Sequence, residues 1–289
     1  MQGLRRWFVS CTVVGLVWCG WSGAVVWAET VGCTAITTAP FTITTPGIYC
    51  VTQDIGTNLA SGNAIQINTS NVVVDLNGHR LGNVVAGPGT TAIGIHAVDR
   101  TNITIKNGTV RGFKFGIFLD DSGNSEGHIV ENIRADLNTF TGIEVAGTGN
   151  IIRNNLVLGT GGTTAFGPNS NIYGIVADGT ENQLLNNAVV NTAAVGTAVA
   201  FAIFVESGSA VVDHNRLSNA ALPGGGLASH GIFVAGEGTD VLVVDNRIAT
   251  MTNGITYDTG STGKYARNLT SGVPAPYTGG TASVAQPND

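Results

Sequence analysis

Charge and tryptophan are scarce in this sequence, and helical patterning is missing from it. Charged residues make up 11% of the 289 residues, and there are 4 tryptophans. No stretch of useful length has the apolar spacing of a capped amphipathic helix. This absence excludes an ordinary helical domain and a doubly wound α/β domain, because both are built with such helices. Glycine is instead abundant, at 41 residues, and valine, isoleucine, threonine and asparagine recur throughout.

The N-terminus has the three parts of a secretory signal peptide. Arg5 and Arg6 precede a long apolar run, and a cleavage site ends at Ala28. We therefore expect residues 1–28 to be removed and the mature protein to be secreted or periplasmic. A retained transmembrane helix is the alternative, because the apolar stretch just reaches the length of about 20 residues that a membrane span needs.

Removal of this segment changes the composition of the chain. All four tryptophans and two of the four cysteines lie within residues 1–28. The basic count falls from 13 to 11 against 19 acidic residues, so the formal net charge becomes −8 instead of −6. Such a charge opposes binding to nucleic acids. The remaining Cys33 and Cys50 allow one pairing, and we expect a disulfide that stabilises the N-terminal cap by about 3 kcal/mol.

A repeated unit runs through the mature chain. A Gly-Ile or Ala-Ile pair opens each unit, and an apolar run that ends in asparagine follows it. The opening residues are Ala64, Gly94, Gly116, Gly142, Gly174, Ala202, Gly231 and Gly254, and the asparagines are Asn77, Asn107, Asn132, Asn155, Asn187, Asn215, Asn246 and Asn268. The offset between the two is 13 residues in five units, as from Ala64 to Asn77, whereas the loops that follow differ in length. Fixed strands with variable loops are typical of a solenoid.

Side-chain alternation explains the repeat. In Gly231-Ile232-Phe233-Val234, Ile232 and Val234 point to one side and Phe233 to the other, so stacked coils bury continuous aliphatic columns. Asparagine tolerates the left-handed backbone of a tight corner, and stacked amides hydrogen-bond as a ladder. We predict an all-β, single-domain right-handed parallel β-helix of about eight coils. It occupies residues 61–270, after an N-terminal cap with the first strands at 29–60 and before a C-terminal tail at 271–289.

Three segments resemble the parallel β-helix repeats of the pectin-lyase-like superfamily. They are Val72-Val73-Val74-Asp75-Leu76-Asn77-Gly78-His79, Ile103-Thr104-Ile105-Lys106-Asn107-Gly108-Thr109-Val110 and Ile151-Ile152-Arg153-Asn154-Asn155. The resemblance implies the fold but not the function, because the superfamily includes polysaccharide lyases, hydrolases, epimerases, phage tail proteins and members without known activity. In its polysaccharide-active members the substrate groove follows one outer strand face.

The predicted register defines an outward face on the opening strands. Two residues after each opener stand Gln66, His96, Phe118, Glu144, Val176, Phe204, Phe233 and Thr256, and four residues after it stand Asn68, Val98, Asp120, Ala146, Asp178, Glu206, Ala235 and Asp258. This face mixes aromatic rings with carboxylates. We predict that Phe118, Asp120, Glu144, Phe204 and Phe233 bind substrate. The alternative for the phenylalanines is packing beneath the loops as part of the core.

Asp178 and Glu206 are the candidate catalytic residues. The longest consecutive loops follow Asn155, Asn187 and Asn215 and lead into the coils that carry these carboxylates and two of the phenylalanines. We expect the two carboxylates to lie about one strand spacing apart, where one carboxyl raises the pKa of the other or both bind a calcium ion. The alternative is a pair of solvated surface charges. We predict no other cofactor and no metal site, because the histidines lack zinc or copper spacing.

Basic residues are missing from the two outward columns. Superfamily lyases that resemble pectate lyase place an arginine base beside a calcium-binding carboxylate cluster on the groove face. In this chain the arginines lie near the asparagine ladder: Arg153, Arg216, Arg247 and Arg267. The adjacent Asp213 and His214 are not predicted to be a catalytic dyad, because consecutive strand residues face opposite sides.

Three functions follow from these observations as alternatives. The leading hypothesis is an exported protein that binds a carbohydrate or cell-envelope polymer along the outward face of the opening strands. The second is a polysaccharide lyase or glycoside hydrolase that uses Asp178 and Glu206. The third is a structural or adhesive surface protein, in which the acidic columns provide only solubility. We expect neither a nucleic acid partner nor a membrane span after signal cleavage.

Overall fold

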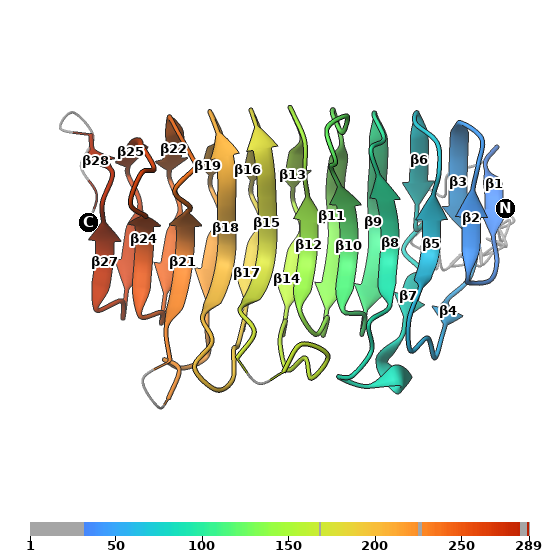
Figure 1. Ribbon diagram of the computed structural model, residues 1–289, viewed down its shortest axis with the longest axis horizontal. Helices are drawn as coiled ribbons and strands as arrows, with labels where there is room; N and C mark the ends of the chain where they lie inside the picture. Colours follow the sequence, from blue (N-terminus) through green and yellow to red (C-terminus); the bar gives the residue numbers. More distant parts are fainter. Residues whose placement is uncertain (1–31, 168, 225–226, 284–287, 289) are drawn as a thin grey trace, which may run out of the picture.

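The chain coils repeatedly around one long axis, so that strands of successive coils lie side by side in parallel (Figure 1). The computed structural model describes residues 32–167, 169–224, 227–283 and 288. The predicted single-domain right-handed parallel β-helix is confirmed. The predicted signal peptide, residues 1–28, lies outside the described residues. Within the described residues we find no helix with the length and apolar character needed to cross a membrane.

One side of the solenoid is a sheet of ten strands in the described chain. Its strands are β2 (Phe41–Ile43), β5 (Asn63–Ile67), β8 (Ile93–Val98), β10 (Phe115–Asp120), β12 (Thr141–Val145), β15 (Ile172–Thr180), β18 (Ala200–Gly208), β21 (Ser229–Val234), β24 (Asn253–Tyr257) and β27 (Ala275–Thr278). The eight strands between β2 and β27 contain the eight predicted opening residues. The N-terminal cap and the C-terminal tail each add one strand to this sheet.

The other two sides form a sheet of eighteen described strands that bends around a corner. Before the corner lie β1 (Thr34–Ile36), β3 (Gly47–Val51), β6 (Val72–Asp75), β13 (Ile151–Arg153), β16 (Gln183–Leu185), β19 (Val211–Asp213), β22 (Val241–Val244), β25 (Gly263–Ala266) and β28 (Thr281–Ala282). After it lie β4 (Ile55–Gly56), β7 (Arg80–Gly82), β14 (Leu156–Leu158), β17 (Ala188–Val190), β20 (Arg216–Ser218), β23 (Arg247–Ala249) and β26 (Leu269–Ser271). Two strands, β9 (Ile103–Arg111) and β11 (Ile129–Asp136), continue through the corner, and the 3₁₀ helix η1 (Val84–Ala86) lies in the loop before β8.

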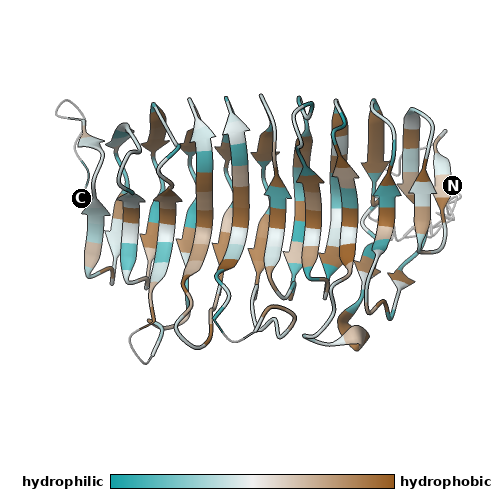
Figure 2. Cartoon of the chain, in the orientation of Figure 1, coloured by the Kyte–Doolittle hydropathy of each residue, from teal (hydrophilic) through white to brown (hydrophobic). Residues whose placement is uncertain are grey.

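Stacked aliphatic columns make the core. One column pairs in register from strand to strand and is at most 1% exposed: Ile65, Ile95, Ile117, Ile143, Ile175, Ile203, Ile232 and Ile255. Figure 2 shows such apolar bands crossing the strands of the ten-stranded sheet. The glycine before this isoleucine permits close stacking, since a Cβ on Gly116 would lie 2.5 Å from the carbonyl oxygen of Gly142. Because a single coil leaves such a column in water, stacking supplies the stability.

A buried asparagine ladder runs along the corner in the C-terminal half. The Nδ2 atoms of Asn155, Asn187, Asn215 and Asn246 each donate to the Oδ1 of the next ladder asparagine at 3.0 Å. The ladder extends one step beyond its predicted last member, because Nδ2 of Asn268 donates to Oδ1 of Asn288, also at 3.0 Å. The residue before each ladder asparagine has a φ of 54–57°: Asn154, Asn186, His214, Asp245 and Arg267. The chain therefore turns at a left-handed residue and points the following amide inward.

The first three units confirm the left-handed asparagine, and Nδ2 of Asn132 donates to Oδ1 of Asn107 at 3.4 Å, but these asparagines are not buried in line with the later ladder. Asn77, Asn107 and Asn132 have φ values of 49°, 57° and 53° and take the left-handed corner position itself. The pairing of β11 with β13 and β14 aligns Asn132 with Asn154, and Ile133 with the ladder residue Asn155. In β9 the ladder position holds Gly108, which pairs with Ile133. Asparagine suits both positions, so its presence at a corner does not distinguish them.

A second buried polar column, which the sequence reading missed, follows the corner next to the ten-stranded sheet. The backbone N–H of Ile103 donates to Nδ1 of His128 at 3.2 Å, and the N–H of His128 donates to Oδ1 of Asn150 at 2.8 Å. The N–H of Asn150 in turn donates to Oδ1 of Asn182 at 3.0 Å. Burial lowers the pKa of His128 to about 4, so its neutral ring accepts this hydrogen bond at neutral pH.

The predicted disulfide closes the N-terminal end of the solenoid. Cys33 and Cys50 are bonded, with their Cα atoms 5.8 Å apart. Cys50 lies in β3, and Cys33 directly precedes β1, which pairs with β3. The bond therefore fastens the first strand of the described chain to the strand of the next coil.

Candidate functional site

The outer face of the ten-stranded sheet follows the predicted register. Phe118 pairs with His96 on one side and with Glu144 on the other, and Phe204 pairs with Phe233. Phe118, Glu144, Phe204 and Phe233 are all half-buried and lie outside the core. The predicted substrate-binding residues thus share one outer face, although their role in binding stays a prediction.

A second column of rings, which we did not predict, adjoins the first. It stands directly before the opening residues, where Tyr173 pairs with Phe201 and Phe201 pairs with His230. Phe115 occupies the same position in β10. The sequence signal for this column was available, since an aromatic residue precedes the opening Gly or Ala in these coils. It was missed because strict alternation assigns that position to the same side as the buried isoleucine, whereas Phe115 and Phe201, although themselves buried, contact the outward rings of Phe118, Phe204 and Phe233.

The two columns join into a continuous aromatic band. We give this name to Phe115, Phe118, Phe140, Tyr173, Phe201, Phe204, His230 and Phe233. Phe115 stacks on Phe118 with ring centroids 4.7 Å apart. No ring lies in β12, but Phe140 just before it contacts Phe115 at 5.3 Å and Tyr173 at 5.8 Å. Phe140 therefore bridges the gap between the rings of β10 and those of β15.

A cation lies among the rings at one end of the band. Nζ of Lys114 is 3.8 Å from the ring centroid of Phe166 and 4.9 Å from that of Phe115. Phe166 belongs to the long loop after Asn155 and also contacts Phe140. Desolvation lowers the pKa of Lys114, and Glu144 partly opposes this effect. The long loop thus reaches the outer face, as expected, and covers part of it with an aromatic ring.

The predicted catalytic carboxylates are neighbours. Asp178 pairs in register with Glu206, which places their Cα atoms about one strand spacing, ~4.8 Å, apart. Burial raises the pKa of Asp178, the N–H of Gly179 opposes this, and nearby acidic residues raise it further. Burial also raises the pKa of Glu206, as do the charges of Asp178 and Glu237. The pair therefore has the electrostatic coupling that we expected, while its catalytic role stays a prediction.

Glu144 is the most strongly perturbed carboxyl on this face. Burial raises its pKa to about 7, and the charges of Asp120 and Asp178 contribute in the same direction. Lys114 opposes the shift. Near neutral pH this side chain is divided between its protonated and ionised forms, which is the state that general acid-base chemistry requires. Glu144 thus combines the predicted position of a substrate contact with the electrostatics of a proton donor.

Two of the hollows in the described chain lie away from the aromatic band, whereas a third, of about 340 Å³, borders it beside Ala200 in β18 and Ser229 in β21. The first, of about 510 Å³, lies at the corner of the eighteen-stranded sheet beside Asn77, Asn107 and Asn132. Another, of about 410 Å³, lies further along the same sheet beside Arg216 and Arg247. The outer face of the ten-stranded sheet therefore presents, in the described residues, an open strip of rings and carboxyls, and its role as a substrate groove stays a prediction.

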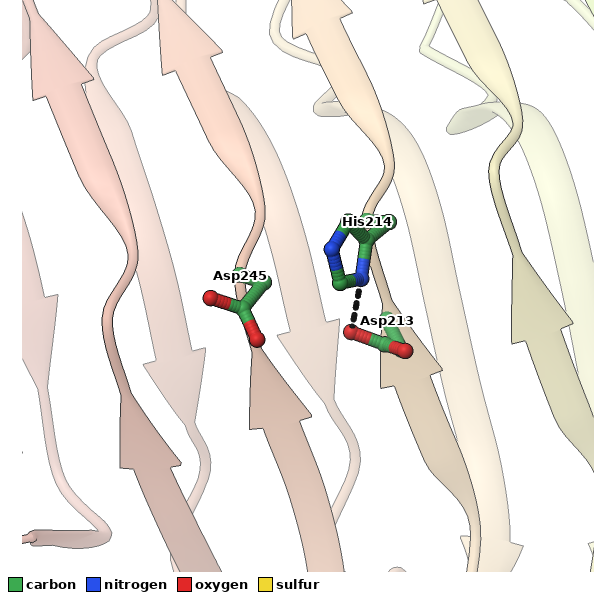
Figure 3. A group of neighbouring side chains, drawn as sticks. All are labelled: Asp213, His214 and Asp245. Atoms are coloured by element: carbon green, nitrogen blue, oxygen red, sulfur yellow. Dashed lines mark hydrogen bonds and ion pairs between the residues drawn. The ribbon is translucent and has the colours of Figure 1, made fainter.

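Asp213 and His214 form a pair that we did not expect. Nδ1 of His214 lies 2.6 Å from Oδ1 of Asp213 (Figure 3). The prediction that they face opposite sides is wrong, because His214 has a φ of 56° and this left-handed corner ends the strand alternation. Asp245 lies close enough to join them around a metal ion. Arg267, however, donates to both carboxylate oxygens of Asp245, so a metal ion would have to displace its guanidinium.

Comparisons with known proteins show a likeness of fold. No protein-family model matches the chain, and no curated protein matches it in sequence. The A-module of the mannuronan C-5 epimerase AlgE6 of Azotobacter vinelandii is similar with a TM-score of 0.47 and 12% identity, over 87% of this chain and 90% of that chain. The Agl-KA catalytic domain has a TM-score of 0.33 and 12% identity, over 82% of this chain and 58% of that chain. Since both TM-scores lie below 0.5, no chemistry is transferred from either protein to this chain.

Proposed function

We propose that this chain is an exported protein that binds a carbohydrate or cell-envelope polymer along the outer face of the ten-stranded sheet. The observation that carries the proposal is the continuous aromatic band, which extends from Phe118 in β10 to Phe233 in β21. Aromatic rings offer flat apolar surfaces on which the C–H faces of sugar rings stack. The carboxylates beside them accept hydrogen bonds from hydroxyl groups.

The dimensions of the band favour a polymer over a single sugar. Its strands, β10, β12, β15, β18 and β21, are consecutive in the ten-stranded sheet. At about 4.8 Å per strand, the band spans roughly 19 Å along the solenoid axis. The rings also repeat along this axis, which suits a ligand that repeats in the same direction. An open strip accepts the middle of a long chain, which an enclosed pocket does not.

Binding to a broad panel of polysaccharides, with and without calcium, tests the proposal. We expect at least one polymer to bind, and we expect the Phe204→Ala, Phe233→Ala double variant to weaken binding at least tenfold. The matched control is Leu242→Ala, which removes an exposed apolar side chain from the other sheet. Wild-type protein that binds no polymer, or equal weakening by the control, contradicts the proposal. A thermal melt of each variant separates lost binding from lost folding.

A second candidate function is favoured by Glu144. With its pKa near 7 beside Asp120 and Asp178, it has the protonation of an acid catalyst at neutral pH. We therefore propose, as the alternative, a polysaccharide lyase or glycoside hydrolase in which Glu144 works with the predicted pair Asp178 and Glu206. The Asp178→Asn, Glu206→Gln double variant and the Glu144→Gln variant should then each abolish turnover without lowering the melting temperature. Unsaturated products indicate a lyase, and new reducing ends without unsaturation indicate a hydrolase.

A further inference from the structure

Arginines collect on the eighteen-stranded sheet, on the opposite side of the core from the aromatic band. We call His214, Arg216, Arg247 and Arg267 the arginine cluster. Together they line a hollow of about 410 Å³ at the corner, next to the asparagine ladder. All four side chains are exposed, although the formal charge of the whole sequence is −6. Positive charge is thus concentrated at one place on an acidic protein.

Arg216 and Arg247 are neighbours in register on adjacent strands. Arg216 in β20 pairs in register with Arg247 in β23, so their backbones are about 4.8 Å apart. The neighbours in the same column are Ala188 before them and Leu269 after them. Like charges directly opposite each other in a sheet are destabilising. The column therefore contains two adjacent cations and no opposite charge to separate them.

These two arginines also lack the ion pairs that other arginines have. In the described chain, five arginines lie within 4.0 Å of a carboxylate: Arg80, Arg111, Arg134, Arg153 and Arg267. No such contact joins a described carboxylate to Arg216 or Arg247. Both side chains line the hollow, where hydrogen bonds from Arg267 lower the pKa of Asp245 and the charge of Arg247 lowers it too.

We propose that the arginine cluster binds an oxyanion, namely a phosphate, sulfate or carboxylate group, with Arg216 and Arg247 as its principal ligands. A guanidinium donates two parallel hydrogen bonds to such a group, and guanidiniums from residues in register on adjacent strands can hold it from both strands. The bound anion neutralises the repulsion between the two arginines. The site is separate from the aromatic band and does not depend on the function proposed for that band.

The neighbouring carboxylates do not turn this hollow into a cation site. Asp213 lies against His214, and both oxygens of Asp245 accept hydrogen bonds from Arg267. A metal ion held by these groups would also face Arg216 and Arg247 across the hollow. Charge therefore favours an anion over a metal ion at this place.

Titration calorimetry of the mature protein at low ionic strength tests the site. The probes are inorganic phosphate, inorganic sulfate and a uronic acid oligosaccharide, each against a chloride background. We expect at least one probe to bind and added sodium chloride to weaken it. The Arg216→Met, Arg247→Met double variant should weaken binding at least tenfold. Tighter binding of the oligosaccharide assigns the anion to a polymer, whereas equal or tighter binding of phosphate or sulfate assigns it to a free ion.

Two controls separate a built site from general charge. Arg153→Met removes an arginine of the same sheet that is paired with Glu131, and it should change binding less than twofold. The Arg216→Lys, Arg247→Lys double variant keeps the charge but loses the planar fork, and it should bind between wild type and the methionine variant. Absence of binding by all three probes overturns the proposal. Equal weakening by Arg153→Met and by the Arg216→Met, Arg247→Met double variant also overturns it.

Discussion

The outer faces of the two sheets belong to the same coils but arrange charge differently. On the ten-stranded sheet, Asp178 and Glu206 lie side by side without a cation between them, and aromatic rings fill the neighbouring positions. On the eighteen-stranded sheet most charges are paired, as in the 2.7 Å contact between Arg153 and Glu131. Among the described arginines of this sheet, Arg216 and Arg247 are the exception, because they pair in register with each other and have no carboxylate within ion-pair distance.

The difference shows how a solenoid separates stability from binding. The aliphatic columns fix the stack, so the outward position of each strand is free to hold any side chain that tolerates solvent. Like charges in register are unfavourable for the sheet itself. Their presence at Asp178 with Glu206, and at Arg216 with Arg247, therefore indicates two places where the surface is suited to a ligand of complementary chemistry.

Removal of one ladder amide should change stability the most, because the outer faces of both sheets are supported by the same stack of coils. The Oδ1 of Asn215 accepts from the backbone N–H and the side chain of Asn187, and its Nδ2 donates to the carbonyl of Leu184 and to Asn246. Asn215→Ala leaves several buried polar groups unpaired and should lower the free energy of unfolding by about 3–5 kcal/mol. Urea denaturation measures this loss.

The matched control for the ladder is Asn132→Gly. Asn132 is exposed and occupies the left-handed corner position, which glycine adopts readily. We expect it to cost less than about 1 kcal/mol. Similar costs for the Asn215 and Asn132 variants would show that the buried ladder contributes no more than an exposed corner, contrary to the structure.

The ionisation of Glu144 should have the next largest effect on the free energy of unfolding. Its pKa is raised from 4.5 to about 7 in the folded protein, so the folded state binds more protons than the unfolded state between these values. The favourable contribution of the protonated carboxyl is thus complete below pH 4.5 and is lost as the pH rises through 7. Glu144→Gln should be more stable than wild type above pH 7, by at most about 3 kcal/mol, and about equal to it at pH 4.5.

Wild type and Glu144→Gln must be compared at each pH, because the ionisation of two histidines changes stability with pH in the opposite direction. Burial lowers the pKa of His128 and of His230 to about 4, so their neutral forms stabilise the fold above pH 6.5 and this contribution is lost as the pH falls toward 4. Both histidines contribute equally to wild type and variant, so their contributions cancel in the difference between the two free energies of unfolding. If denaturation experiments gave the same stability difference between variant and wild type at pH 4.5 and at pH 8, they would contradict the raised pKa of Glu144.

The sequence predicted the repeat well because the repeat is a property of local alternation. The eight opening residues all lie in the ten-stranded sheet, and Phe204 pairs with Phe233 as the register required. The errors arose at residues that leave strand geometry. Asn132 takes the left-handed corner itself, as predicted, whereas His214 takes it one residue before Asn215, and a pattern of residue types does not distinguish these two arrangements.

The band itself shows a second kind of error, in which the relevant residue lies between repeats. Phe140 and Phe166 stand outside the two outward columns, yet Phe140 joins the rings of β10 to those of β15. Their loops have no repeat from which a position in space follows. Contacts made by loops therefore came only from the structure, as did the ring column directly before the opening residues, whereas the pairing of Phe204 with Phe233 followed from counting.

Phe140→Ala tests whether the band acts as one surface. The variant removes the ring contacts with Phe115 and Tyr173 and so divides the band at β12. We expect about tenfold weaker binding of a long oligosaccharide, equivalent to about 1.4 kcal/mol. A short oligosaccharide that needs only the rings of β15 to β21 should bind as before. Affinity measured over a series of ligand lengths distinguishes a continuous band from two independent patches.

The smallest expected effect separates paired from unpaired arginines on the eighteen-stranded sheet. Arg153→Met removes the ion pair with Glu131 and should lower stability by less than about 1 kcal/mol, with the loss shrinking in high salt. Arg216→Met instead removes one of two like charges in register, so it should raise stability by about 0.2–1 kcal/mol at low salt. If urea denaturation gives stability changes of opposite sign for the two variants, the Arg216 side chain destabilises the fold. Because a saturating oxyanion stabilises only proteins that bind it, its addition should stabilise wild type more than Arg216→Met and so reduce or reverse the difference between them.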